Sequence, residues 1–291
     1  MALQKFDIVA ANGMKFFLQL DPQDMAQRDV IAHFLSGQMY EHETSLLFLK
    51  ALRPGDTAVD VGGNAGYFTM LAATQVGAQG RVVTAEANPG LAKLIRDSAA
   101  LNDISHLSVE NVAISDRNGQ IVFGSNGPND SNGGVVPEKT PGEALESNDT
   151  ITQFVARAET LDSLASRSGL ESIRLLKIDT EGHELNVLKG AEGLLRGKKI
   201  DFIAAELNLP GLARNRTTQN ELRRFMLDHG YHMFLLDHNG ALPRLVPPGT
   251  EVRQTYTCNV LFSRIETLAE VWDSVANEPA AVHIAQRQSK S

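Results

Sequence analysis

The sequence is poor in cysteine, in basic residues and in long apolar runs, and each shortage excludes a class of protein. Its only cysteine, Cys258, cannot form an intrachain disulfide, and a zinc site built from cysteines is excluded as well. The 27 lysines and arginines are outnumbered by 35 aspartates and glutamates, and the resulting net charge of −8 argues against a protein that binds nucleic acid by neutralising phosphates. No apolar run approaches the roughly 18 residues of a membrane helix, and the first residues lack the apolar core of a signal peptide. We therefore expect a cytoplasmic protein without a membrane span.

Short apolar segments alternate with helical patterns through most of the chain. Strands are predicted at 57–61, 81–86, 107–114, 174–179, 201–207, 231–236 and 255–262, and helices at 40–52, 66–76, 88–101, 184–195 and 219–229. Such alternation predicts an α/β fold, with a doubly wound, mostly parallel sheet covered by helices on both faces. Only a turn-rich connection joins the last two strands, so we expect them to pair as an antiparallel hairpin.

The flanking segments differ from this core. Residues 1–39 are expected to form a small β-hairpin around Asn12-Gly13 and a lead-in, and residues 40–265 the main domain. Within that domain, residues 124–149 are rich in glycine, proline and asparagine, which indicates a mobile loop that is either a substrate lid or a surface insertion. Residues 266–291 are expected to form a C-terminal helix and a frayed tail.

A glycine-rich turn follows the first strand of the core. Residues 59–68 read VDVGGNAGYF, so an apolar strand leads through glycines into a helix whose free N–H groups suit an anionic ligand. A dinucleotide-binding fingerprint counted from Gly62 requires glycine at positions 64 and 67, where the chain has Asn64 and Tyr67. The turn therefore predicts a nucleotide-type site but not a typical NAD site.

Two further groups of polar residues follow predicted strands. Glu86 closes the second strand, where an acid accepts hydrogen bonds from both hydroxyls of a ribose; the alternative is that it helps to cap the next helix. Asp179, Glu181 and His183 follow a buried strand, at the edge where ligands bind in open α/β sheets. Helix capping remains an alternative for Glu181, and a half-exposed helical position for His183.

These segments together resemble a known family. Residues 60–68 look like motif I of S-adenosylmethionine methyltransferases, and KIDTEGHEL at 177–185 with VLKGA at 187–191 resembles the hallmark of FkbM-type methyltransferases. Further matches are YE at 40–41, NVAISD at 111–116 and TLD at 160–162. The resemblance runs from about residue 14 to 264. It implies a seven-stranded class I fold with a reversed last strand, S-adenosylmethionine as cofactor, and O-methylation of a hydroxyl on a sugar, glycan or polyketide-like metabolite.

The resemblance also implies roles for individual residues. Cofactor-binding residues are expected at Asp60, Gly62, Gly63, Asn64, Gly66, Glu86, Val112 and Ala113. Glu86 would bind the ribose, Val112 and Ala113 would lie near the adenine, and Asp60 would contact the amino group of the methionine part. Asp179 and Glu181 would face the methyl group, and one of them, or His183, would deprotonate or orient the acceptor. Glu41 and Glu206 are expected on the acceptor side.

Other functions are left open by the sequence. The chain could bind S-adenosylmethionine or a nucleoside without catalysis, or it could be an NAD-dependent enzyme, although the failed fingerprint argues against the latter. We expect no metal; the alternative is a magnesium ion held by Asp179, Glu206 and Asn208, all at strand ends. The partner is expected to be a small-molecule or glycan acceptor rather than nucleic acid.

Overall fold

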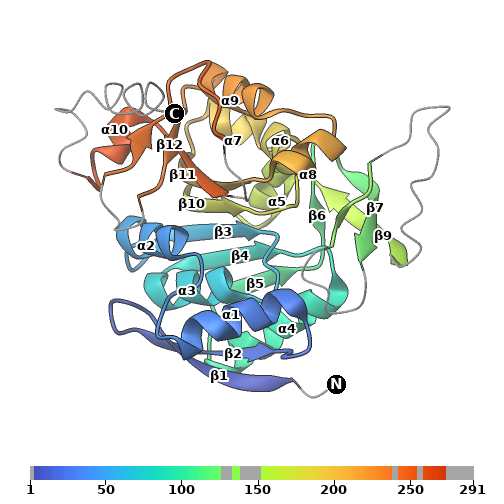
Figure 1. The fold of residues 1–291 in the computed structure, drawn as a ribbon, viewed down its shortest axis with the longest axis vertical. Helices are drawn as coiled ribbons and strands as arrows, with labels where there is room; N and C mark the ends of the chain where they lie inside the picture. Colours follow the sequence, from blue (N-terminus) through green and yellow to red (C-terminus); the bar gives the residue numbers. More distant parts are fainter. Residues whose placement is uncertain (1–2, 126–132, 138–151, 238–241, 254–257, 273–291) are drawn as a thin grey trace.

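The computed structural model describes residues 3–125, 133–137, 152–237, 242–253 and 258–272. Its centre is an eight-stranded sheet in the order β13-β12-β14-β11-β10-β3-β4-β5 (Figure 1). The parallel strands that position the site are β3 (Thr57–Val61), β4 (Arg81–Ala85), β5 (Leu107–Glu110), β10 (Ile173–Ile178) and β11 (Ile200–Leu207). The chain order reverses between β3 and its neighbour β10, and such a switch point is where open α/β sheets bind their ligands.

The antiparallel end of the sheet confirms the predicted pairing and adds one strand. β14 (Cys258–Ser263) lies between β11 and β12 (His232–Leu235) and is antiparallel to both. A two-residue strand, β13 (Arg244–Leu245), extends the edge, which gives eight strands instead of the seven expected. The doubly wound α/β fold that the sequence predicts is thereby confirmed.

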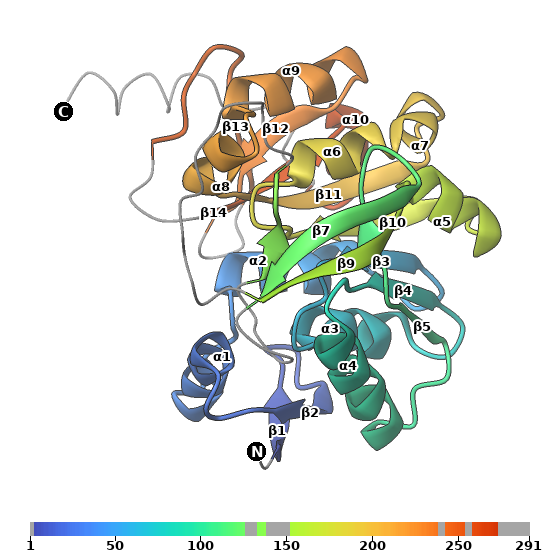
Figure 2. The same cartoon turned by 90° about the vertical axis from the view of Figure 1, so that its right-hand side faces the viewer.

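Helices cover both faces of the sheet, because successive residues of each buried strand point to opposite sides. On one face Ala58 and Val82 pack with the hairpin β1 (Gln4–Val9) and β2 (Lys15–Leu20), and on the other Val59 and Val83 contribute to a second core. The first face carries α1 (Met25–Leu35), α2 (His42–Ala51), α3 (Tyr67–Val76) and α4 (Pro89–Leu101). The second carries α5 (Leu161–Arg167), α6 (Glu184–Lys189), α7 (Glu192–Arg196), α8 (Leu209–Arg214) and α9 (Gln219–Asp228) (Figure 2).

Two predicted elements are divided in the structure. The strand expected at 107–114 ends at Glu110, because the Asn111 amide donates to the carbonyls of Glu86 and Ala87 and turns the chain. The helix expected at 184–195 breaks after Lys189, since the Asp162 carboxylate caps a new helix through the N–H groups of Gly193 and Leu194.

A second, smaller sheet was not predicted. It consists of β6 (Ala113–Ile114), β7 (Gly119–Ser125), β8 (Gly134–Val135) and β9 (Thr152–Glu159), in the order β6-β9-β7-β8. It stands beside the carboxyl ends of the central strands (Figure 2). Of the predicted loop 124–149, residues 124–125 and 133–137 belong to this sheet or border it, and 126–132 and 138–149 lie outside the described residues.

The chain ends differ in how far they can be compared with the prediction. The hairpin is present, and α1, which follows it, was not predicted even though Asp24 caps it by accepting from the Gln27 N–H. α10 (Ile265–Leu268) begins the expected C-terminal helix, and residues 273–291 lie outside the described part. Among the described residues, no helix is both long and apolar enough to cross a bilayer.

The first testable consequence concerns the turn after β3. Gly62 has φ +81°, and a Cβ there would lie 1.8 Å from the carbonyl oxygen of Asp179. We expect Gly62→Ala to lower the unfolding temperature far more than Gly230→Ala, because Gly230 has φ +83° but open space around it. The control variant should lose only the left-handed backbone penalty, about 1–2 kcal/mol. Thermal unfolding of both variants measures the difference, and equal losses would contradict the close packing of these strand ends.

Candidate active site

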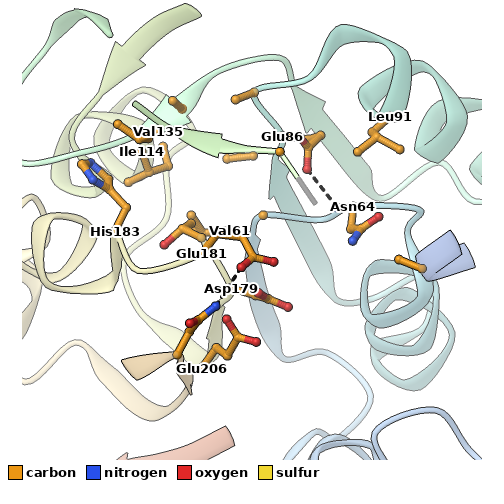
Figure 3. A pocket seen from close by; sticks show the side chains of 18 of the residues that line it. Val61, Asn64, Glu86, Leu91, Ile114, Val135, Asp179, Glu181, His183 and Glu206 are labelled. Carbon is orange, nitrogen blue, oxygen red and sulfur yellow. Dashed lines mark hydrogen bonds between the residues drawn. The ribbon is translucent and has the colours of Figure 1, made fainter. Parts of the chain in front are cut away.

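A cavity of about 540 Å³ opens at the carboxyl ends of β3, β4, β10 and β11, a volume typical of a small-molecule site. It shares Tyr40, Glu41, Gly62, Asn64 and Asp179 with a second pocket of about 30 Å³, so the two form one continuous site. In Figure 3, Glu86, Asn64 and Leu91 lie on one side of the larger cavity, and Asp179, Glu181 and Glu206 gather on the other.

Most of the predicted site residues meet here. The larger cavity is lined by Glu41, Gly62, Asn64, Glu86, Val112, Ala113, Asp179, Glu181, His183 and Glu206. Asp60 and Gly63 line the smaller pocket. Gly66 lines neither; it begins α3 with φ +92° and packs against Ile95, so it shapes the turn from behind.

Glu86 is held rigidly at the side of the cavity. Its carboxylate accepts hydrogen bonds from the backbone N–H groups of Asn64 (2.9 Å) and Asn88 (2.7 Å). Burial raises its pKa to about 7, although these two N–H groups oppose that rise. Each carboxylate oxygen has a second lone pair, so the side chain can still accept from the hydroxyls of a ribose.

The smaller pocket has an acidic floor. Asp60 is 2% exposed, and its Oδ2 accepts from the Thr69 hydroxyl at 2.6 Å. Its Oδ1 is buried and has no hydrogen-bond partner among the described residues. Burial raises the pKa of Asp60, and the nearby Lys177 ammonium opposes this. A buried acceptor of this kind suits an amino group.

Lys177 is a site residue that the sequence analysis missed. It lies opposite Asp60 in the β3–β10 register, is 2% exposed, and donates to Asp179 Oδ2 at 2.7 Å. Burial alone would lower its pKa, but the charges of Asp179, Glu41 and Asp60 outweigh burial and raise it. A lysine directly within the apolar run of residues 175–178 was the signal that could have identified it, because a buried ammonium needs acidic partners.

A group of three carboxylates faces the rest of the cavity. Asp179, Glu181 and Glu206 each offer an oxygen, and these oxygens lie within 4.8 Å of one another. Burial and the neighbouring acids raise the pKa of Glu181 to about 7 and that of Glu206 to about 10. Of the magnesium alternative, Asp179 and Glu206 belong to this group, and Asn208 lies beside it: its amide donates to Glu181 (2.8 Å) and accepts from the Gly211 N–H (2.9 Å).

His183 is the most constrained of the three candidate catalytic residues. It is 5% exposed, with Nε2 2.9 Å from the Ser115 hydroxyl and Nδ1 3.1 Å from the Asn186 amide. Burial lowers its pKa, so the neutral imidazole is favoured. The expected half-exposed position is therefore wrong, because α6 packs this histidine against Ser115, although the residue still lines the cavity.

The N-terminal segment closes the opposite wall. Glu41 adopts a left-handed conformation (φ +41°), and its carboxylate accepts from the Asn259 amide at 2.6 Å. Burial raises the pKa of Glu41, and Lys177 opposes the rise. Besides these, the sequence analysis missed Asp29, His33, Phe123, Val135 and Asn259 as lining residues. The sequence gave no sign that Asn259 in β14 lies beside Glu41, which is 218 positions away at the start of α2.

Together the fold and the cavity define a methyltransferase of the class I type. A family model described as the methyltransferase FkbM domain matches residues 60–233, which is more than half of the chain. The chain belongs to this FkbM methyltransferase family, and its cofactor is S-adenosylmethionine. No curated protein gives a significant match.

Solved structures are similar at low sequence identity. A methyltransferase dependent on S-adenosylmethionine from Aquifex aeolicus is 15% identical, with 84% of this chain and 98% of that chain covered and a TM-score of 0.41. An O-methyltransferase from Bacillus cereus in complex with S-adenosylhomocysteine is 13% identical, with 84% of this chain and 91% of that chain covered and a TM-score of 0.38. A precorrin-6y C5,15-methyltransferase from Geobacter metallireducens is 13% identical, with 76% of this chain and 85% of that chain covered and a TM-score of 0.36. The family membership rests on the domain match, not on these scores.

The residues present fit the cofactor. Asp60 Oδ1 offers an unpartnered buried acceptor among the described residues, and Glu86 stands beside the same turn. Gly62 and Gly63 let that turn pack closely against Asp179 and against Thr84 and Ile95, where a Cβ would clash. This fit, with the family match, favours a methyltransferase over the NAD-dependent alternative.

A pH dependence of cofactor binding follows from Glu86. Its pKa of about 7 means that the carboxylate, the stronger acceptor for ribose hydroxyls, is lost as the pH falls through 7. We expect the affinity for S-adenosylhomocysteine to rise roughly 10-fold between pH 6 and pH 8, since the ionised fraction of a group with a pKa near 7 changes by that factor. Calorimetry at both pH values measures it. Glu86→Gln should bind weakly and equally at both, and a flat profile in the unmodified protein would contradict this role.

Proposed function

We propose that this protein is an O-methyltransferase that transfers a methyl group from S-adenosylmethionine to a hydroxyl of a sugar, glycan or polyketide-like metabolite. The observation that carries the proposal is the position of Asp179, which lines both the small pocket and the larger cavity. The amino group of the cofactor's methionine end would reach the small pocket beside Asp60, and Glu181 and Glu206 line only the larger cavity. An acceptor hydroxyl can therefore approach within reach of an acid.

The reaction needs little covalent chemistry from the protein. S-adenosylmethionine supplies a methyl group bonded to a positively charged sulfur. The acceptor oxygen forms a bond to the methyl carbon, the carbon–sulfur bond breaks with its electrons left on sulfur, and the hydroxyl proton passes to a carboxylate. Alignment of the reacting groups contributes up to about 7–11 kcal/mol in favourable systems, and a general base about 10²–10⁴-fold.

Glu181 is the carboxylate best suited to accept the proton. Its pKa of about 7 lies near neutral pH, where a general base is most effective. The Asn208 amide donates to one oxygen of the Glu181 carboxylate at 2.8 Å. The backbone of Glu181 is left-handed (φ +56°), and strained conformations of this kind cluster at functional sites. Asp179 is paired with Lys177 and is assigned to positioning, and His183 to the wall of the cavity.

The experiment that tests the function is transfer of labelled methyl from S-adenosylmethionine to candidate hydroxyl acceptors. Incorporation that survives acid and mild base, as an ether does, supports O-methylation of a hydroxyl; label on carbon or nitrogen would contradict it. A non-catalytic binding module, the competing function, would bind S-adenosylhomocysteine and transfer no label to any acceptor. The expected cytoplasmic location and the division at residues 39 and 265 stay predictions.

A second measurement separates binding from catalysis. We expect Glu181→Gln to lower kcat by about 10²–10⁴-fold at pH 8 and to remove the fall in kcat below pH 7. At saturating cofactor this fall reports Glu181, because titration of Glu86 affects cofactor affinity instead. Glu86→Ala should weaken binding of S-adenosylhomocysteine far more than Glu181→Ala does. Calorimetry that gave the opposite order would mean that the ribose lies elsewhere.

A further inference from the structure

The acceptor side of the cavity carries a strong charge of one sign. Six carboxylates line the larger cavity, and all but Glu86, which is assigned to the ribose, are on the acceptor side: Asp29, Glu41, Glu86, Asp179, Glu181 and Glu206. Among the described lining residues of the larger cavity there is no lysine or arginine. A phosphate, sulfate or carboxylate on the acceptor would lie among these acids without a lining lysine or arginine to bind it, so an anionic acceptor is disfavoured.

The nearest buried cation is already committed. Lys177 donates to Asp179 at 2.7 Å and lines only the smaller pocket. Its charge therefore offsets the acids at the methionine end, and its effect on Glu206 is smaller than that of each neighbouring acid. The charge of Arg214 acts on Glu181 and opposes the rise of its pKa, whereas no ion pair of Glu206 occurs among the described residues.

The wall beside Glu206 offers acceptors that lack donors. Glu206 and Asn259 are direct partners in the β11–β14 register. Glu206 Oε2 and Asn259 Oδ1 are both buried, and neither has a hydrogen-bond partner in the described part of the chain. The Asn259 amide nitrogen donates to Glu41, and no hydrogen bond joins it to Glu206 Oε2 among the described residues. A ligand group that fits here brings several N–H donors and a positive charge, which describes a protonated amine.

We propose that the acceptor is an amino alcohol, such as an amino sugar, whose protonated amine binds Glu206 and Asn259 while its neighbouring hydroxyl faces Glu181 and is methylated. This inference rests on the proposed methyl transfer. The amine and the hydroxyl belong to adjacent carbons because the oxygens of Glu181 and Glu206 lie within 4.8 Å of each other. Burial is the main cause of the raised pKa values of Glu181 and Glu206, and the neighbouring acids add to it; an arriving cation would offset the contribution of those acids.

The test uses the charge of the methylated product. The full-length protein and labelled S-adenosylmethionine are incubated with a small-molecule cell extract and with a panel of amino sugars, their N-acetyl forms, the parent neutral sugars and sugar phosphates. The labelled product should bind a cation exchanger. An acceptor whose amine is acetylated before the reaction should have a kcat/KM at least about 10-fold lower than the free amine. Label in neutral or anionic products overturns the amine but keeps the methyl transfer. No label in any fraction, from protein that binds S-adenosylhomocysteine, overturns the proposed function itself.

Matched variants locate the amine. Glu206→Gln preserves shape and should raise KM for the amine acceptor at least about 10-fold, leave KM for S-adenosylmethionine unchanged, and reduce the preference for amine over N-acetyl. Glu171→Gln, an exposed position before β10 at the opposite end of the sheet, should change none of these values. Thermal unfolding confirms that each variant is folded. Loss of activity in EDTA that magnesium restores would overturn the inference, since the three carboxylates would then hold a metal ion.

Discussion

A single buried ammonium group allows acidic side chains to crowd the edge of this sheet. Lys177 lies opposite Asp60 across two parallel strands and donates to Asp179, two positions further along its own strand. Its ammonium group also lies over the Phe68 ring, 4.7 Å from the centroid. Removing one partner of a buried ion pair typically costs about 3–5 kcal/mol, because the other charge is then left without compensation. The cofactor side of the site therefore depends on this lysine for both charge and shape.

The backbone imposes a second constraint at the same place. The Asp179 N–H donates to the Val61 carbonyl at 2.9 Å, so the β3–β10 ladder continues to the point where both chains turn. Gly62 can turn there only because it lacks a Cβ, and Gly182, with φ +100°, similarly packs against the backbone of Gly211. Two tight turns thus face each other across the switch point. One places backbone N–H groups toward the cofactor, and the other places Asp179 and Glu181 toward the acceptor.

The sequence predicts the parts of this arrangement that are encoded locally. Alternating apolar strands and helices identify the central sheet, and Glu86 could be placed because an acid that ends the strand after a glycine turn lies beside that turn. Lys177 could have been identified as well, since the residues on both sides of it in the strand, Leu176 and Ile178, are apolar. The contact between Glu41 and Asn259 could not, because 218 positions separate them and neither segment carries a pattern that indicates the other. The small sheet was missed for a related reason: β7 and β9 expose one face, so their apolar pattern is weak.

The two groups of carboxylates around Asp179 differ in how their charge is balanced. Around Lys177 the acids have an opposing charge within the fold, whereas Glu206 keeps a buried oxygen without a partner among the described residues. Replacing such an acid by an apolar residue of similar volume is often neutral or stabilising, so the fold itself gives no reason to keep it. Uncompensated acids lower the stability of the free protein, and natural proteins accept such losses where function requires them. Because the pKa of Glu206 is raised to about 10, the free protein holds this side chain in its neutral form near pH 7, and a ligand that brings a positive charge would favour its ionised form only when it is bound.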